Sequence, residues 1–251
     1  MTGWIKGAAI AALVAAATVW SGSPVGAQEL TKQDVEATVR ELLQREPELV
    51  LEALQEVQRK REAEAAALQR DAVAGNAELL FEDPMAPIGG NPDGDVTLVE
   101  FFDYQCGFCR RMVPTLRALL ADDDQVRLVF KELPILGPES VEATKAALAS
   151  VRQDRYLDFH FALMASQDLT PDGIRAAAES VGLDVEQLFA DMADPAITMQ
   201  INANYALART LGIEGTPAMV IGEEFVPGAV EDARLRELIA TERARCETAT
   251  C

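Results

Sequence analysis

The sequence has little histidine and little cysteine: one histidine, His160, and four cysteines among 251 residues. A structural zinc site requires four ligands, usually from a second cysteine pair or a pair of histidines, and the sequence offers no such set. Four cysteines are also too few to be the disulfide framework of a chain of this length. A single histidine between Phe159 and Phe161 is typical of a packed core residue, which disfavours cysteine–histidine catalysis.

Basic residues are scarce as well. The chain has 22 lysines and arginines against 41 aspartates and glutamates, which gives a net charge of −19 and a pI of about 4.4. A protein this acidic is repelled by phosphate backbones, so we expect no nucleic-acid partner. Hydrophobic residues make up 49% of the chain, which is enough for one core with an appendage.

The first 27 residues are typical of an export signal. Lys6 precedes an apolar run from Gly7 to Trp20, and small residues lead to a predicted cleavage after Ala27. A membrane anchor is the alternative, but the run is short, rich in alanine and not followed by a basic flank. We therefore expect an exported protein in an oxidising compartment, where disulfides form and persist.

Residues 28–75 are predicted to be a charged helical segment. Thr31 and Asp34 have the spacing of a capping box, Pro47 restarts the helix, and Gly75 is a plausible end. The apolar residues follow one narrow helical face, which comprises Val35, Val39, Leu42, Leu43, Val50, Leu54 and Val57. Such a seam either packs on the chain's own domain or is buried against other copies in an oligomerisation stalk. We favour the stalk, because the segment lies outside the domain that follows.

Residues 76–251 predict an α/β domain. A strand ends near Tyr104, a helix follows, and a second strand covers 126–134, which together form a βαβ unit with a parallel strand pair. A block of helices occupies about 139–212. A hairpin with its turn near Gly222 and a last helix over 229–245 complete the domain.

Cys106 and Cys109 form a C-x-x-C motif where the first strand gives way to a helix. A zinc knuckle lacks its second ligand pair here, and a purely structural bridge across so short a loop would restrict the unfolded chain very little. A redox pair fits better, because free backbone N–H groups and the helix dipole stabilise a thiolate at a helix N-terminus. We predict that Cys106 is the nucleophile and Cys109 the resolving thiol, with a Cys106–Cys109 disulfide in the oxidised state.

The wider sequence around this motif resembles a known family. The stretch FFDYQCGFC after a strand, Pro114 in the following helix, and Gly215-Thr216-Pro217 before a later strand are similar to the thioredoxin superfamily. The inserted helical block resembles its DsbA branch, and FKELPILGPES with the N-terminal helices looks most like the ScsC-related periplasmic members. The resemblance covers about 81–245. It implies a thioredoxin fold with an inserted helical block, preceded by an N-terminal helical segment.

The resemblance also implies roles for single residues. It implies a cis peptide bond at Thr216-Pro217, whose exposed backbone would pair with an extended substrate beside the nucleophile. Glu100 takes the place of the buried acid of DsbA-like proteins. Lys131, on the next strand, is its expected partner, and together they would pass a proton to or from the resolving cysteine. A surface salt bridge at the strand end is the alternative for this pair.

Tyr104, Gly107 and Phe108 are expected at the rim of the site, in contact with unfolded substrates. Phe108 departs from the strongly oxidising DsbA enzymes, which carry a histidine at that position. A phenylalanine cannot hydrogen-bond a thiolate, so we expect a milder lowering of the Cys106 pKa and a less oxidising pair. This favours isomerase or reductase activity.

The sequence thus predicts a periplasmic thiol–disulfide oxidoreductase acting on unfolded or misoxidised exported proteins and reset by a membrane redox partner. No cofactor or metal is expected. The alternatives are a dithiol oxidase of the DsbA type, or a non-enzymatic stalked chaperone or Cu(I)-binding protein. The tail cysteines, Cys246 and Cys251, stay open between a small-loop disulfide, free or intermolecular thiols, and a second redox or metal-binding pair.

Overall fold

The structure is a computed structural model that describes residues 30–248. The predicted export signal with its cleavage after Ala27 and the tail residue Cys251 lie outside the described residues. The chain divides into two compact units between Val57 and Gln58. The division falls inside helix α2, which runs from Glu48 to Gly75.

The first unit contains helix α1 (Lys32–Arg45) and the start of α2. The predicted capping box is present, because the Asp34 N–H donates to Thr31 Oγ1 while the Thr31 N–H donates to the Asp34 carboxylate. No residue of α1 is buried. Most seam residues are 41–62% exposed, namely Val35, Val39, Leu43, Val50, Leu54 and Val57. The seam therefore has no covering partner among the described residues of this unit.

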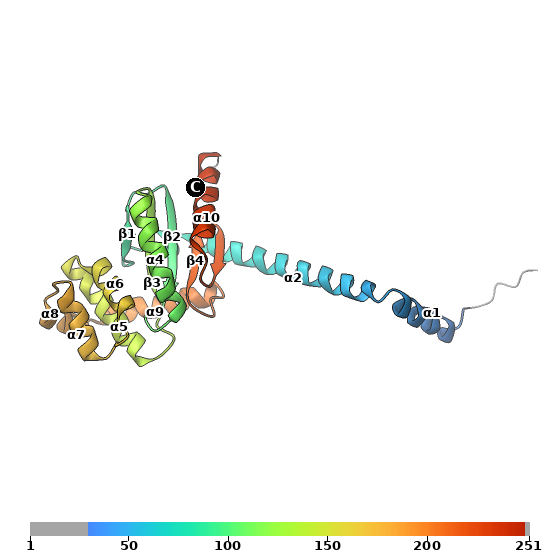
Figure 1. The fold of residues 1–251 in the computed structure, drawn as a ribbon, viewed down its shortest axis with the longest axis horizontal. Helices are drawn as coiled ribbons and strands as arrows, with labels where there is room; N and C mark the ends of the chain where they lie inside the picture. Colours follow the sequence, from blue (N-terminus) through green and yellow to red (C-terminus); the bar gives the residue numbers. More distant parts are fainter. Residues whose placement is uncertain (1–29, 249–251) are drawn as a thin grey trace, which may run out of the picture. The chain divides into compact units, whose positions relative to one another are not determined.

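The second unit is built on a five-stranded sheet with the order β1-β3-β2-β4-β5 (Figure 1). Strand β2 (Val96–Phe102) runs parallel to β3 (Val126–Glu132), and helix α4 (Gly107–Asp122) connects them, as predicted. Strands β4 (Ala218–Ile221) and β5 (Glu224–Pro227) form the predicted hairpin, with Gly222 at a positive φ of 55° in its turn.

Strand β1 (Ile88–Gly90) lies in a stretch rich in glycine and proline, where the sequence predicts turns. It pairs antiparallel with β3 at the sheet edge. A Cβ atom on Gly90 would lie 2.4 Å from the Val126 carbonyl oxygen, so the strand can approach β3 only because that position is glycine. Because glycine is uncommon in strands, residue propensities do not predict a strand at this position.

Strand alternation separates the core into two layers, one on each face of the sheet. Leu98 and Phe102 of β2 face a layer that includes both C-x-x-C cysteines and residues of α4 and α10 (Asp232–Thr248). Val99 and Phe101 face the other layer, which holds the end of α2, helix α3 (Ala77–Phe81) and part of α9 (Pro195–Thr210). Alternate residues along a strand therefore face the layer with the cysteines, and the residues between them face the other layer.

Five helices separate β3 from β4, as predicted for the inserted block. They are α5 (Pro138–Ser150), α6 (Tyr156–Ala165), α7 (Pro171–Ser180), α8 (Val185–Asp191) and α9, with a 3₁₀ turn at Val151–Gln153. Thr170 and Asp184 cap α7 and α8 with their side chains. Helices α5 to α8 gather at one side of the sheet (Figure 1).

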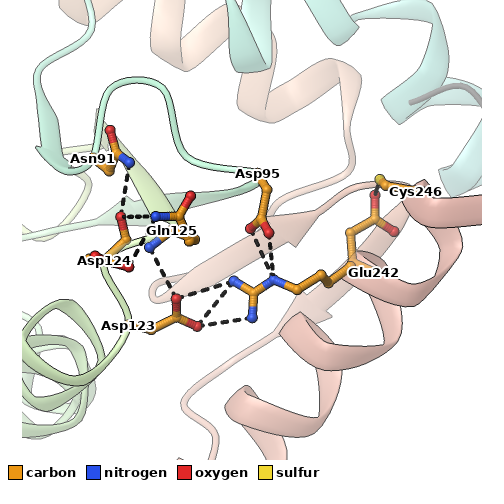
Figure 2. Close-up of polar contacts among 8 residues, drawn as sticks. Asn91, Asp95, Asp123, Asp124, Gln125, Glu242 and Cys246 are labelled. Atoms are coloured by element: carbon orange, nitrogen blue, oxygen red, sulfur yellow. Dashed lines mark hydrogen bonds and ion pairs between the residues drawn. The ribbon is translucent and has the colours of Figure 1, made fainter.

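Charged side chains hold the last helix, α10, against the end of the sheet at which β2 begins. Arg243 bonds both Asp95, just before β2, and Asp123, just after α4 (Figure 2). These contacts of Arg243 lie at the end of β2 that is remote from the cysteines, so they contribute to the fold and not to the site.

Candidate active site

Cys106 is the N-cap residue of α4, at the point where the turn after β2 enters the helix. The backbone N–H of Cys109 donates to Cys106 Sγ over 3.3 Å. The Cys106 thiol in turn donates to the carbonyl oxygen of Thr216 over 3.1 Å. Cys106 is 6% exposed and Cys109 only 1%, so a reagent can reach the first sulfur far more easily than the second.

The two thiols are free in this structure, so the predicted Cys106–Cys109 disulfide is absent from it. Their surroundings push their pKa values apart. The pKa of Cys106 is lowered to about 5, chiefly by a hydrogen bond from the Cys109 side chain, against the opposing effect of burial. The pKa of Cys109 is raised, because its thiol is hydrogen-bonded to the Cys106 thiolate and is buried. One thiolate nucleophile and one protonated resolving thiol are the states that disulfide exchange needs.

Thr216-Pro217 is the one cis peptide bond of the described residues. It precedes β4, which pairs antiparallel with β2, and this pairing brings the 216–217 peptide beside Cys106. Thr216 is partly exposed and Pro217 is buried. The structure therefore brings together the two motifs that the sequence analysis paired, although their roles stay predictions.

Glu100 is buried on β2, on the face that carries the cysteines. Its Oε2 atom has no hydrogen-bond partner among residues 30–248. Burial raises the pKa of Glu100 to about 8, and the neighbouring charges of Cys106 and Glu132 act in the same direction. A buried carboxyl group that titrates near neutral pH, on the same face of the sheet as a buried thiol, is suited to exchanging a proton with that thiol.

The predicted partnership of Glu100 with Lys131 is wrong. In the parallel pairing of β2 and β3, Glu100 lies opposite Phe130 and Phe101 lies opposite Lys131, so the lysine points to the other face of the sheet. Lys131 is 1% exposed, and its Nζ atom bonds Asp83 at 2.6 Å. Lys131 is on the strand next to Glu100, but a shift of one residue along a strand reverses the face on which a side chain lies.

Tyr104 is also not at the rim. Its side chain is fully buried, and its hydroxyl donates to Glu132 over 3.2 Å and lies 3.1 Å from His160 Nδ1. The turn after β2 directs the ring toward α6 instead of toward solvent, because the aromatic layer there includes Phe102 and His160. His160 is buried among aromatic rings, which confirms its predicted core role.

Gly107 and Phe108 occupy the exposed positions expected of a rim. Phe108 is 57% exposed, and the Arg111 guanidinium lies 4.0 Å from its ring centroid. This apolar side chain stands beside a nearly buried sulfur, which suits contact with an unfolded substrate. Substrate contact by either residue remains a prediction.

Two acids of the site escaped the sequence analysis. The Asp103 carboxylate accepts hydrogen bonds from the backbone of Gln105 and Leu136 and from Ser140, and so ties the cysteine turn to the start of α5. Glu132 is fully buried at the end of β3, on the same face as Glu100. Parity counting from Phe130 would have found Glu132. At Asp103 only the Gln105 contact is local, and the partners that tie it to the site, Leu136 and Ser140, are remote in sequence.

Among the described residues, no group of three or more histidine, cysteine, aspartate or glutamate side chains is placed to hold a metal ion. Residues 30–248 also contain no helix with both the length and the apolar character that a membrane crossing needs. Cys246 on α10 is disulfide-bonded and lies beside Glu242 (Figure 2). What the tail cysteines do stays a prediction, since Cys251 is not described.

Residues 97–240 match the profile of the DSBA-like thioredoxin domain. The chain belongs to this family. A linker-deletion mutant of ScsC from Proteus mirabilis is 30% identical, covers 89% of this chain and 100% of its own, and superposes with a TM-score of 0.66. A thioredoxin-like oxidoreductase from Silicibacter pomeroyi is 46% identical over 66% of this chain and 97% of its own, with a TM-score of 0.65. The predicted fold and family resemblance are confirmed.

Some curated relatives are much longer than this chain. The Na⁺/H⁺ antiporter NhaA 3 of Salinispora tropica is 31% identical over 169 residues, which is 62% of this chain but 26% of the antiporter. This chain therefore spans about a quarter of the length of the antiporters it matches.

Proposed function

We propose that the protein is a thiol–disulfide oxidoreductase of the DsbA type. The observation that carries the proposal is the position of Cys106 Sγ, at the N-cap of α4 and within hydrogen-bond distance of both Cys109 N and Thr216 O. A helix N-terminus favours a thiolate there, and the lowered Cys106 pKa of about 5 agrees. Thr216 is partly exposed, and its backbone offers a place for the chain that bears the target cysteine.

The reaction proceeds in two exchanges. The Cys106 thiolate attacks one sulfur of a substrate disulfide; the substrate S–S bond breaks, a mixed disulfide forms, and the other substrate sulfur leaves as a thiolate that takes up a proton. Cys109 then loses its proton and attacks Cys106 Sγ, which releases the second substrate thiolate. The substrate gains two electrons, and the Cys106–Cys109 pair loses them. The reverse sequence oxidises a substrate dithiol.

Glu100 is the group suited to receive the Cys109 proton. The Cys109 thiol is buried and its pKa is raised, so it needs a base inside the protein rather than in bulk water. Glu100 is buried on the same face, has an unpaired Oε2 atom and titrates at about 8. In the oxidising direction the protonated Glu100 would return the proton to Cys109.

Substrate recognition is proposed to rest on backbone pairing and apolar contact. While Cys106 is protonated, the Thr216 carbonyl oxygen accepts a hydrogen bond from its S–H group, and it loses this donor when Cys106 ionises. It is then available to a backbone N–H of an extended substrate. The exposed Phe108 ring adds apolar contact without sequence preference, which suits unfolded or misoxidised proteins as clients.

The direction of electron flow is proposed to favour isomerase or reductase work, because Phe108 cannot stabilise the Cys106 thiolate by a hydrogen bond. The reduction potential of the pair tests this. A value near that of the strongest oxidases, about −120 mV, would instead support the dithiol-oxidase alternative. The Phe108→His variant should make the pair more oxidising, and Gly107→Ala, at the adjacent exposed position, is the matched control.

The proposed setting is the periplasm, with exported proteins as clients and a membrane thiol–disulfide protein as redox partner. The export signal predicted for residues 1–27 supports this location. Self-association through residues 28–75 is part of the same proposal, because the apolar seam of α1 and α2 lacks cover within its own unit.

The deciding experiment is a trapping assay with Cys109→Ala. An oxidoreductase that lacks its resolving thiol should accumulate mixed disulfides with client proteins through Cys106, seen as reducible adducts by mass spectrometry. The Cys106→Ser variant is the control and should form none. A non-enzymatic chaperone would suppress aggregation equally well with or without either cysteine, and a Cu(I) carrier would lose copper binding in both variants without forming adducts.

A further inference from the structure

Glu132 is a buried acid held by hydroxyl groups alone. Its Oε1 atom accepts hydrogen bonds from Tyr156 at 2.8 Å and Tyr104 at 3.2 Å, and its Oε2 atom accepts one from Thr144 at 3.1 Å. In the part of the chain that the structure describes, no lysine or arginine lies within ion-pair distance of it. Three donors around one carboxyl group favour its ionised form, since they point toward the charge.

Glu132 lies on the same face of the sheet as Glu100. Phe102 of β2 pairs with Glu132 of β3, and Glu100 pairs with Phe130, so the two acids are two positions apart on neighbouring strands. Both face the layer that contains Cys106 and Cys109. The two carboxyl groups therefore share one water-poor region and feel each other's charge.

The hydrogen bonds of the two acids differ. Burial is the largest cause of a raised pKa at both acids, and the pKa is about 8 for each even though three hydroxyl groups oppose the rise at Glu132. The contacts distinguish the two acids: three hydroxyl groups donate to the Glu132 carboxyl group, whereas Glu100 Oε2 has no hydrogen-bond partner among the described residues. When two acids share a site and only one is stabilised, that one carries the charge and the other keeps the proton. We assign the charge to Glu132 and the exchangeable proton to Glu100.

The other groups that face Glu132 supply no positive charge. Burial lowers the pKa of His160 on α6 to about 3, which keeps this ring neutral. Asp103, in the turn after β2, raises the Glu132 pKa, and burial raises the pKa values of Tyr104 and Tyr156. The remaining polar neighbours are Thr144 of α5 and Asn204 of α9, whose amide donates to the Glu132 carbonyl oxygen.

We propose that Glu132 is a positioning residue whose carboxylate, fixed by Tyr104, Tyr156 and Thr144, makes Glu100 a stronger base toward Cys109. The proposal rests on the redox function proposed above. Glu132 itself exchanges no proton in the step. The proton leaves Cys109 for the Glu100 carboxylate, and the Cys109 thiolate attacks Cys106 Sγ and expels the substrate thiolate. The negative charge at Glu132 disfavours a second negative charge at Glu100, and so draws the proton to it.

The sign of the effect follows from this repulsion. If the Glu132 charge is removed, Glu100 ionises more easily and its pKa falls. The base form of Glu100 is then populated at lower pH, but it is a weaker base for a thiol whose pKa is raised. The resolving step should therefore begin at lower pH and reach a lower maximal rate.

An aromatic disulfide reagent separates the two steps. Its first coloured thiolate reports attack by Cys106, and its second reports resolution by Cys109. In Glu132→Gln the pH midpoint of the second release should move down by about half a unit or more, with a lower plateau, while the first release is nearly unaffected. The Glu142→Gln variant removes a charge from the exposed side of α5 and should leave both midpoints in place. An unmoved second midpoint in folded Glu132→Gln overturns the proposal.

Further variants keep the test independent of the fold of Glu132→Gln. Thr144→Val removes one hydroxyl and should shift the second midpoint in the same direction, and Thr144→Ser should restore it. In a Glu100→Gln background, Glu132→Gln should produce no further shift. A shift that persists without Glu100 would show that Glu132 acts elsewhere. A wild-type protein that never makes the second release would instead refute the proposed redox function itself.

Discussion

The Sγ atom of Cys106 lies 3.1 Å from the carbonyl oxygen of Thr216, although 110 positions separate the two residues in the sequence. This contact joins the chemical and the binding halves of the site. While Cys106 is a thiol, the carbonyl is occupied by its S–H group. When Cys106 ionises, the carbonyl loses its donor and can accept a substrate N–H. Thiolate formation and substrate docking should therefore be coupled.

The first prediction concerns the Cys106 pKa. Since the Cys109 side chain is the main cause of its lowering to about 5, Cys109→Ala should raise it. The pH dependence of iodoacetamide alkylation measures this value, with Cys106→Ser as the blank. An alkylation midpoint that is the same in Cys109→Ala and in the wild type would contradict this assignment of the cause.

The same lowering has a consequence for stability. A group whose pKa is lower in the folded than in the unfolded protein stabilises the fold above its unfolded pKa, and this contribution is lost as pH falls through the folded value. The reduced protein should thus gain stability relative to the oxidised one between about pH 5 and pH 9. Thermal unfolding of both redox forms across this range checks the direction.

The second prediction concerns Glu100, whose raised pKa should make the stability of the fold decrease, not increase, as pH rises. Stability from a buried protonated acid is fully present below the unfolded pKa and is lost as pH rises through the folded value of about 8. Glu100→Gln should match the wild type near pH 4 and be more stable above pH 8, by about 1.4 kcal/mol for each unit of pKa shift. The oxidised protein is used, so that the thiols do not titrate. Equal stability of both proteins above pH 8 would argue against a protonated Glu100.

Much of this site could be predicted from short sequence patterns. The strand before Cys106, the helix after it, and Thr216-Pro217 before β4 each carry a local signal, and the fold brings them together as expected. Lys131 and Tyr104 were misplaced because the direction of a side chain depends on strand parity and on what a turn packs against. Those are tertiary facts, set here by the β2–β3 register and by the aromatic layer of α6.

The buried polar groups show the same limit. Glu132 reads in the sequence as one more charged residue at a strand end, and the helices that supply its hydroxyl donors come later in the chain. Burial of an acid is recognisable only when the segments that cover it are placed. Strand β1 could not be predicted for a related reason: its glycines are required by the close approach to β3, and glycine does not favour strands.

The third prediction separates Lys131 from the chemistry. Lys131 is 1% exposed, whereas its partner Asp83 is 21% exposed. Removal of Asp83 leaves a buried unpaired charge, so Asp83→Ala should cost about 3–5 kcal/mol of stability. Lys131→Met leaves a carboxylate that can reach water, and should cost less. Denaturant unfolding measures both. Lys131→Met should also leave the rate of the Cys109 step unchanged; a slowed step would restore the lysine to the proton path.

The fourth prediction concerns the N-terminal helices and the length that self-association requires. Val73 of α2 is buried in the core of the second unit, and Gln69 bonds the Leu211 carbonyl, so the end of this helix belongs to that unit. Deletion of residues 28–75 would damage the domain as well as the seam. Substitutions confined to the first unit give a cleaner test.

Val39→Glu combined with Leu54→Glu places two charges on the exposed seam, where the wild-type residues are 49% and 62% exposed. Ala37→Glu with Gln55→Glu adds the same charge to other exposed positions of the same helices. If the seams of several copies cover one another, light scattering should give a multiple of the chain mass for the wild type and the control pair, and a single chain mass for the seam pair. The resolving step at Cys109 should survive in all three, because both pairs lie in the first unit and the thiol site is built from residues of the second. A wild type of single chain mass would show that the seam remains open to solvent and that residues 28–75 are not a stalk.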